Sequence, residues 1–174
     1  EDIYTIGICT PGAISLKSGR LKNSNTLCLI DQPIKEDLED RLNKKVEMEN
    51  DANCFALAET MMGASKGYNF VFGIIMGTGV GGGIVCNGIV HKGSNRIAGE
   101  WGHHCLIYNG RSCYCGKNGC TESYISGPAL EKRWTELTGN QQTMENIIPC
   151  YNDEALRDIY VNWKSDFLKY FGQS

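Results

Sequence analysis

The sequence has no marked excess of charge of either sign and no long hydrophobic run. It contains 17 Lys and Arg against 20 Asp and Glu, a net charge of −3, with a pI near 5.6. Proteins that bind nucleic acid through its phosphates usually carry a basic surface, so we expect no nucleic acid partner. No apolar segment reaches the roughly 18 residues that a membrane helix needs, and no signal peptide is recognisable. We therefore expect no membrane partner and a cytoplasmic location.

The common nucleotide-binding motifs are also missing. There is no GxxxxGK[ST] loop, and although Gly77-x-Gly79-x-x-Gly82 fits the dinucleotide pattern formally, that motif must open a helix. Here a strand-like segment, Ile84-Val85-Cys86, follows instead, and Asn87-Gly88 predicts a type I′ turn before another strand. The dinucleotide interpretation therefore fails. A glycine-rich hairpin tip can still bind phosphate oxygens through several backbone N–H groups.

What the sequence does contain is a tight group of metal-binding residue types. Cys113, Cys115 and Cys120 follow His103 within a glycine-rich stretch. Three thiolates and one imidazole form the ligand set of a closed, tetrahedral structural zinc site. Three ordinary reduced cysteines, or disulfides, are the alternatives, and disulfides are less expected without a secretory signal. His104 is a rival ligand, and spacing alone cannot choose between the two histidines.

The remaining cysteines are predicted to be small core residues, because most have apolar neighbours in the sequence: Cys9, Cys28, Cys54, Cys86, Cys105 and Cys150.

Apolar periodicity predicts an alternation of strands and helices. Strands are expected at 4–9, 46–49 and 69–76, the last as a buried run, and helices at 34–42, 54–62, 128–137 and 153–171. Asn50 and Asp51 precede the second helix, where both residue types are favoured as N-caps. Ser126 and Pro128 are typical of the start of the third helix.

The segments Gly99-Glu100-Trp101-Gly102-His103 and Cys113-Tyr114-Cys115-Gly116-Lys117-Asn118-Gly119-Cys120-x-Glu122 together resemble the signature of the ROK family (repressors, open reading frames and sugar kinases). The resemblance extends over nearly the whole chain and is greatest to the bacterial fructokinase branch. It implies an α/β fold of the actin-like, ribonuclease-H-like class. Residues 1–67 would form part of a small N-terminal domain that carries the catalytic aspartate. Residues 68–174 would form part of a larger domain with the phosphate-binding hairpin and the zinc loop, and the sugar cleft would lie between the domains.

The function that this resemblance implies is ATP-dependent phosphorylation of a hexose, with fructose as the first expectation and Asp51 as the base. The ligands would be the hexose, ATP with Mg²⁺, and a structural Zn²⁺, and the full-length protein is expected to be a homodimer. The implied sugar contacts are Asn50, Glu100, His103, Glu122 and Gly12. The implied phosphate contacts are Gly77, Thr78 and Gly79. The implied zinc ligands are His103, Cys113, Cys115 and Cys120, so the family pattern favours His103 over His104.

Two other functions are compatible with parts of the sequence. A sugar-sensing regulator of the same family could keep the zinc motif after its kinase activity was lost, but the intact Asn50-Asp51 and Gly77-Thr78-Gly79 segments favour a kinase. A zinc-stabilised scaffold would leave both segments unexplained. Family kinases are longer than this chain and carry an Asp-x-Gly-Gly-Thr loop and a glycine-rich adenosine-binding stretch, neither of which we find here. We therefore expect a fragment that is inactive by itself.

Overall fold

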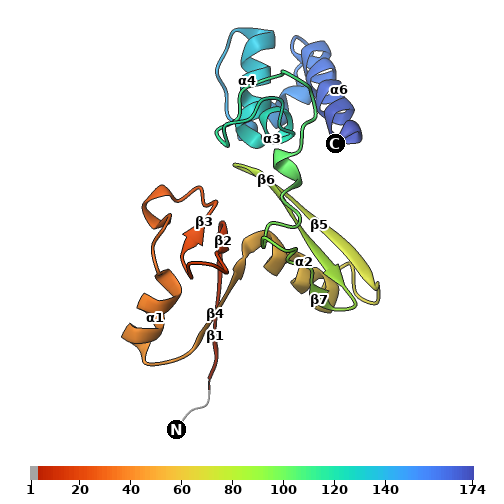
Figure 1. Cartoon of the computed structure of the whole chain (residues 1–174). Coiled ribbons are helices and arrows are strands. Elements are labelled where there is room, and N and C mark those ends of the chain that lie inside the picture. Colours follow the sequence, from red (N-terminus) through yellow and green to blue (C-terminus); the bar gives the residue numbers. More distant parts are fainter. Residues whose placement is uncertain (1–3) are drawn as a thin grey trace. The chain divides into compact units, whose positions relative to one another are not determined.

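The computed structural model describes residues 4–174 (Figure 1). They form two compact units, which we describe separately: residues up to 74 together with 82–99, and residues 75–81 together with 100–174. The boundary expected near residue 67 lies inside the first unit. These units are defined only by contacts within this chain. They do not test the predicted domain division at 67/68, which stays a prediction.

The first unit contains two small sheets and one helix ahead of the candidate catalytic segment. Strand β1 (Ile6–Thr10) pairs in parallel with β4 (Val46–Asn50), so that Thr10 lies opposite Asn50. Strands β2 (Ala13–Ile14) and β3 (Leu21–Lys22) form an antiparallel pair. A short 3₁₀ helix, η1 (Leu27–Leu29), and helix α1 (Ile34–Leu42) connect β3 to β4. The predicted helix at 34–42 is therefore confirmed.

Helix α2 (Asp51–Met62) follows β4 without a loop and covers a three-stranded sheet in the order β5 (Phe70–Met76), β6 (Val80–Cys86), β7 (Ile89–Val90). Their shared core consists of Ala56, Val71 and Val85. Asn87 and Gly88, between β6 and β7, have φ values of 50° and 76°. Both residues are therefore left-handed, as the predicted type I′ turn requires.

Two details of this sheet differ from the sequence prediction. Strand β5 is not a buried run, because Phe70 is 66% exposed and Phe72 is 42% exposed while Val71 between them is buried. Its uniformly apolar sequence hides the alternation of a strand with one covered face. Strand β6 begins at Val80 and takes in the glycines at 81–83, so only residues 77–79 remain as a turn. We call these three residues the glycine turn.

The second unit is mainly helical. Its elements are η2 (Trp101–His103), α3 (Glu122–Ile125), α4 (Gly127–Thr138), α5 (Met144–Ile147), η3 (Ile148–Asn152) and α6 (Arg157–Gln173). The side chain of Ser126 caps α4 by accepting a hydrogen bond from the Ala129 N–H, and left-handed Gly139 ends the helix, both as predicted. The last helix begins at Arg157 and not at residue 153, because turns occupy the intervening residues. The main core of the unit is formed by Leu130, Trp134, Ile147, Cys150 and Trp163.

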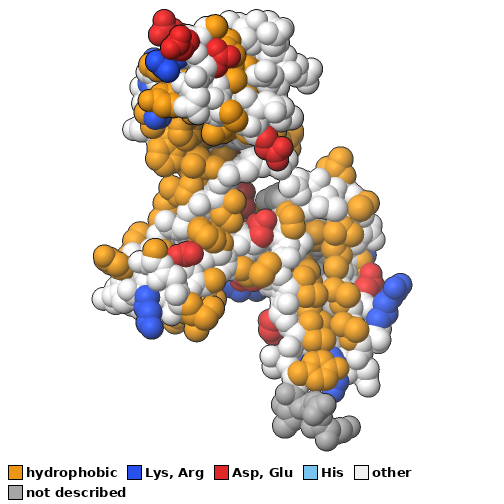
Figure 2. Space-filling model, turned by 180° about the vertical axis from the view of Figure 1, so that it is seen from behind, with side chains coloured by type: hydrophobic (Ala, Val, Ile, Leu, Met, Phe, Trp, Pro, Cys, Tyr) orange, Lys and Arg blue, Asp and Glu red, His pale blue; other side chains and the backbone are white. Residues whose placement is uncertain are grey.

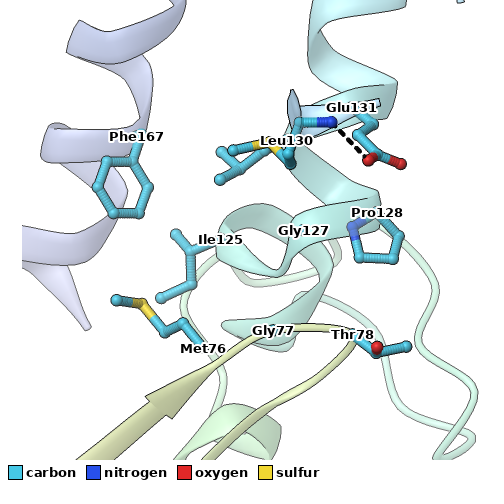
Figure 3. A pocket seen from close by; sticks show the side chains of 10 residues that line it. Met76, Gly77, Thr78, Ile125, Gly127, Pro128, Leu130, Glu131 and Phe167 are labelled. Carbon is cyan, nitrogen blue, oxygen red and sulfur yellow. Dashed lines mark hydrogen bonds between the residues drawn. The ribbon is translucent and has the colours of Figure 1, made fainter. Parts of the chain in front are cut away.

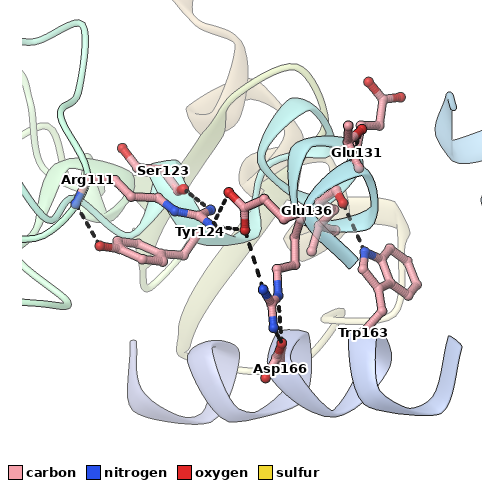
Figure 4. Close-up of polar contacts among 10 residues, drawn as sticks. Arg111, Ser123, Tyr124, Glu131, Glu136, Trp163 and Asp166 are labelled. Atoms are coloured by element: carbon pink, nitrogen blue, oxygen red, sulfur yellow. Dashed lines mark hydrogen bonds and ion pairs between the residues drawn. The ribbon is translucent and has the colours of Figure 1, made fainter. Parts of the chain in front are cut away.

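Polar contacts connect α4 to α6 and to the loop before α3 (Figure 4). Arg111 forms an ion pair with Glu136 at 3.0 Å and donates to the Ser123 carbonyl at 3.1 Å. Arg133 contacts both Glu136 and Asp166, the latter at 2.7 Å. These partly exposed pairs share Glu136 and Arg133, so they form one network across the loop, α4 and α6.

The prediction that six cysteines outside the cluster are core residues is wrong for three of them. Cys9, Cys28 and Cys105 are exposed, Cys54 and Cys86 are half-buried, and only Cys150 is buried. All nine cysteines lie within the described residues and are free thiols. Hydrophobic side chains also reach the surface over both units on the face that Figure 2 shows. No helix within residues 4–174 is both long and apolar enough to cross a membrane.

Candidate functional site

Asn50 and Asp51 lie where β4 passes directly into α2, and the structure separates their roles. Asn50 is the N-cap: its Oδ1 accepts from the N–H groups of Ala52 and Asn53, at 3.0 and 3.2 Å. Asp51 is the first helical residue and is exposed. Its Oδ1 accepts only from the Ala52 N–H, at 2.9 Å, among the bonds described. The Asp51 side chain is therefore accessible to a ligand hydroxyl at the N-terminus of α2.

Glu49 organises this segment, and the sequence interpretation missed it. Its Oε1 accepts from the backbone N–H of Asn50 and from the Asn53 side chain, both at 3.0 Å. Its Oε2 forms an ion pair with Lys92. Burial would raise the pKa of the Glu49 carboxyl, but Lys92 and the two amide donors outweigh it and lower that pKa. No sequence signal identified this role, because Lys92 comes from a distant part of the chain.

Gly12 contacts this segment directly, because its carbonyl oxygen accepts from Asn50 Nδ2 at 3.1 Å. Gly12 is buried with φ +86°, and a Cβ there would lie 2.4 Å from the Lys22 carbonyl oxygen. Only glycine fits this left-handed, crowded position. The structure therefore brings together two of the predicted sugar contacts, Gly12 and Asn50, in the first unit.

In the second unit, His103, Cys113, Cys115 and Cys120 converge. One ligand atom from each lies within 4.8 Å of all the others. The Cys115 and Cys120 Sγ atoms are 3.6 Å apart, and the Cys113 Sγ is 3.6 Å from His103 Nδ1. With zinc bonds of about 2.3 Å to sulfur and about 2.05 Å to nitrogen, a tetrahedron requires S···S near 3.8 Å and S···N near 3.6 Å. The donor set and its spacing therefore fit a zinc ion.

The geometry also favours His103 over His104 as the fourth ligand. His103 directs Nδ1 at Cys113, whereas the exposed His104 ring contacts Thr121, with Nδ1 3.5 Å from its hydroxyl. Burial and the neighbouring thiols raise the pKa of Cys120 to about 12. Because a cysteine binds zinc as its thiolate, zinc binding would release the Cys120 proton.

The loop that carries these ligands, residues 103–120, depends on tight backbone turns. We call it the cysteine loop. The Cys113 N–H donates to the Lys117 carbonyl at 2.9 Å, and the Gly116 N–H donates back to the Cys113 carbonyl at 3.0 Å. Gly119 has φ +78°, and a Cβ there would lie 1.7 Å from the Ile107 carbonyl oxygen. Only glycine therefore fits this left-handed, crowded position directly before Cys120.

Glu100, Glu122 and Tyr114 lie around this cluster. Glu100 is half-buried and is the N-cap residue of η2, the turn that carries His103. The Tyr114 hydroxyl is 3.2 Å from His103 Nε2. Partial burial first, and then the charges of Glu122, Cys113 and Glu100, raise the pKa of Tyr114 to about 12. The phenol therefore lies near both of the carboxylates predicted to contact sugar.

Glu122 is not a solvated loop carboxylate. It is 8% exposed, and its Oε2 accepts from the backbone N–H of Val80 at 2.8 Å. Val80 follows the glycine turn, so Glu122 fixes one side of that turn. On the other side the Gly77 carbonyl accepts from the Gly127 N–H at 2.8 Å. The cysteine loop, α4 and the glycine turn therefore form one connected structure within the second unit.

A pocket of about 520 Å³ opens beside the glycine turn (Figure 3). Met76, Gly77 and Thr78 form one wall, and Glu131 lies opposite, where its Oε1 accepts from the Met144 N–H at 2.8 Å. The other lining residues are Ile125, Gly127, Pro128, Leu130, Met144 and Phe167. Gly77 and Thr78 are exposed. The Thr78 hydroxyl is therefore accessible to a ligand in this pocket, whereas the Gly77 N–H and carbonyl are paired with Gly79 and Gly127. The pocket volume lies within the range of small-molecule sites.

This combination of fold and motifs belongs to a known family of sugar kinases and related proteins. The ROK family model matches residues 1–162, and the chain is a member of that family. The chain is 38% identical over 161 residues to an N-acetyl-D-glucosamine kinase of Histophilus somni, a match that covers 86% of this chain and 53% of the relative. It is also 38% identical over 173 residues to an N-acetylgalactosamine kinase of a Shewanella species, covering 91% and 55% respectively.

Solved structures confirm the predicted fold class. The ROK hexokinase from Thermus thermophilus superposes with a TM-score of 0.83 at 31% identity, covering 97% of this chain and 55% of that one. A ROK glucokinase from Streptomyces griseus, solved with glucose and AMPPNP, gives a TM-score of 0.80 at 26% identity, covering 97% and 59%. The fold is therefore that of the actin-like ROK sugar kinases. The chain spans about half the length of the curated relatives it matches.

The expected similarity to the fructokinase branch is not supported. The two curated relatives above are kinases of N-acetylhexosamines by name. The zinc signature and the Asn-Asp pair do not distinguish one sugar from another. The identity of the sugar depends on pocket shape, which these motifs do not encode.

Proposed function

We propose that the full-length protein is an ATP-dependent kinase of an N-acetylhexosamine that transfers the γ-phosphate to a sugar hydroxyl. The observation that carries this proposal is the 38% identity to kinases named for N-acetylglucosamine and N-acetylgalactosamine. The family match at residues 1–162 includes every residue to which we assign a role. Fructose, the sugar expected from the sequence, is replaced by these two candidates.

Asp51 is assigned as the base. Its carboxylate is exposed at the N-terminus of α2 and accepts a single described hydrogen bond. Phosphoryl transfer proceeds through a loose transition state, in which the acceptor hydroxyl loses its proton late. Positioning therefore matters more than basicity. The Asn50 cap and the Glu49 contacts, which hold the first turn of α2 in place, supply that positioning.

The sugar hydroxyls are assigned to Asn50, Glu100, His103 and Glu122, with Gly12 supporting Asn50. Carboxylates suit this task because they accept charge-assisted hydrogen bonds from vicinal hydroxyls. Glu122 already uses Oε2 on Val80, which leaves Oε1 for the substrate. One carboxylate would then hold both the sugar and the start of β6.

The phosphates are assigned to the glycine turn. The N–H groups of Thr78 and Gly79 and the exposed Thr78 hydroxyl can donate to phosphate oxygens. The Gly77 N–H already donates to the Gly79 carbonyl at 2.9 Å, so Gly77 contributes by closing the turn. The neighbouring 520 Å³ pocket shares Gly77 and Thr78 with this turn, so we assign it to the nucleotide side of the site. When Mg²⁺ is bound with ATP, it supplies neutralisation of the phosphate charge.

Zinc is assigned a structural role at His103, Cys113, Cys115 and Cys120. Four protein ligands leave no open position for a substrate or water, which is typical of structural sites. The ion would hold the cysteine loop together and fix the orientation of the His103 ring. The chemistry is assigned to Asp51 and to ATP.

Three further expectations are kept as proposals. The full-length protein is proposed to be a homodimer, to bind no nucleic acid and to act in the cytoplasm. The alternative, a sugar-sensing regulator, has weaker support. A ROK family transcriptional regulator superposes with a TM-score of 0.78 at 25% identity, whereas the relatives at 38% identity are kinases by name.

The test is a panel of sugars with the full-length protein and Mg·ATP. N-acetylglucosamine, N-acetylgalactosamine, glucose and fructose are compared by kcat/KM from sugar-dependent ADP release. We expect one of the two N-acetylhexosamines to be the best substrate. Sugar-independent ATP hydrolysis serves as the control. Fructose as the best substrate would restore the original expectation, and no turnover with any hexose would favour the regulator.

A further inference from the structure

Tyr114 occupies an unusual position, between two of the metal-binding cysteines and against the histidine. Its hydroxyl is 3.2 Å from His103 Nε2, and the two rings meet edge to face, with centroids 5.3 Å apart and an interplanar angle of 83°. The side chain is nevertheless 75% exposed. It is therefore held chiefly by this one contact.

The contact matters because His103 has only two ring nitrogens. Nδ1 faces the Cys113 sulfur at 3.6 Å, where it belongs to the group of metal-binding atoms. Nε2 is then the only ring atom left for a substrate hydroxyl. The Tyr114 hydroxyl takes that hydrogen-bonding position, 3.2 Å from Nε2.

We propose that Tyr114 sets the affinity threshold of the sugar site: its hydroxyl competes with a sugar hydroxyl for His103 Nε2 and must move when the sugar binds. This inference rests on the proposed function, which assigns His103 to the sugar. Tyr114 also lies near Glu100 and Glu122, the other assigned sugar contacts of this unit. A ring that is three-quarters exposed can change rotamer without disturbing a packed core.

The competition lowers affinity for every sugar by the same factor, so only a sugar with enough further contacts binds well. A neutral hydrogen bond contributes about 0.5–1.5 kcal/mol net, which corresponds to about a two- to tenfold change in Kd. Removing the Tyr114 hydroxyl should therefore tighten sugar binding by that factor. Losing an ordinary substrate contact would weaken it instead, so the sign of the change separates the two roles.

The experiment compares full-length wild type with Tyr114→Phe, which keeps the ring and removes only the hydroxyl. Tyr108→Phe is the matched control, because Tyr108 belongs to the same loop and is 85% exposed. Calorimetry with N-acetylglucosamine and with N-acetylgalactosamine gives Kd, elemental analysis gives the zinc content, and steady-state kinetics separate KM from kcat. ¹⁵N NMR reports the environment of His103 Nε2 with and without sugar.

For Tyr114→Phe we expect Kd and KM to fall about two- to tenfold, with kcat and zinc content unchanged. Tyr108→Phe should match wild type. The His103 Nε2 resonance of sugar-free wild type should change both in Tyr114→Phe and on adding sugar.

An unchanged or weaker Kd in Tyr114→Phe, while wild type binds sugar, would overturn this inference and leave the proposed function intact. Loss of zinc in that variant would make Tyr114 a support of the metal ligands, which also overturns it. Failure of wild type itself to bind any sugar would overturn the proposed function and the inference together.

Discussion

Glu122 provides the sharpest structural prediction, because its buried carboxylate joins α3, which follows the cysteine loop, to the residue after the glycine turn. Its Oε2 accepts from the Val80 N–H at 2.8 Å, and the two residues are 8% and 5% exposed. Glu122→Ala removes the acceptor and leaves that N–H buried without a partner. Glu122→Gln keeps an oxygen in the same place and removes only the charge.

The magnitudes follow from what each change leaves behind. An unsatisfied buried donor costs about 1–3 kcal/mol, so we expect Glu122→Ala to lower the free energy of unfolding by that amount. A neutral acceptor retains about half the strength of a charged one, so Glu122→Gln should cost less than about 1 kcal/mol. Both variants lose the carboxylate assigned to the sugar, so both should weaken sugar binding.

Two glycines of the turn provide an independent control. A Cβ on Gly79 would lie 2.7 Å from Glu122 Oε2, whereas a Cβ on Gly77 would meet nothing within 4 Å. Gly79→Ala should therefore displace the carboxylate and destabilise the protein, and Gly77→Ala should not. Urea unfolding of the four variants measures the differences. Equal stability of Glu122→Ala and Glu122→Gln, or of the two glycine variants, would refute the reasoning.

Two further predictions concern the other parts of the site. In the first unit, the pKa of Glu49 is held below its ordinary value of 4.5, so its stabilising contribution is present above the unfolded pKa and is lost as the pH falls through the folded one. Glu49→Gln should thus flatten the dependence of unfolding free energy on pH below about 4.5, as urea titrations at several pH values would show, and an unchanged slope would contradict it. In the second unit, protein purified without added metal should contain one zinc per chain, and Cys113→Ser with Cys115→Ser should abolish it. Elemental analysis that finds no zinc in wild type, or full retention in the double variant, would rule out the cluster as a zinc site.

The helices and turns that could be predicted from the sequence are those whose first or last residues have strong short-range conformational preferences. Helix α4 has Ser126 as its cap and Gly139 as its left-handed end, and the turn at Asn87-Gly88 has the two positive φ values that its residues favour. Both are short-range preferences, so a single sequence suffices to find them. The metal-binding group was found for the same reason, since its three cysteines lie within eight residues.

The parts that the sequence could not predict depend on contacts between distant residues. Glu49 controls the Asn50 segment through Lys92, which is 43 residues further along the chain, and Glu122 binds a backbone group 42 residues before it. Neither pattern is visible without the fold. The exposure of Phe70 and Phe72 could not be predicted from the sequence either, because a continuous apolar run shows no polar alternation even when only one face of the strand is covered.

The central claim is that this chain carries the sugar-phosphorylating centre of a ROK kinase with Asp51 as its base, and one comparison tests it most directly. Rates of phosphate transfer from ATP to N-acetylglucosamine are measured for full-length wild type and Asp51→Asn, with sugar affinity measured on the same samples. Asn50 remains the helix cap, and an asparagine at 51 can still accept from Ala52, so folding and sugar binding should persist. We predict a loss of about 10²–10⁴-fold in kcat with Kd for the sugar little changed. Near-normal turnover by Asp51→Asn would contradict the account.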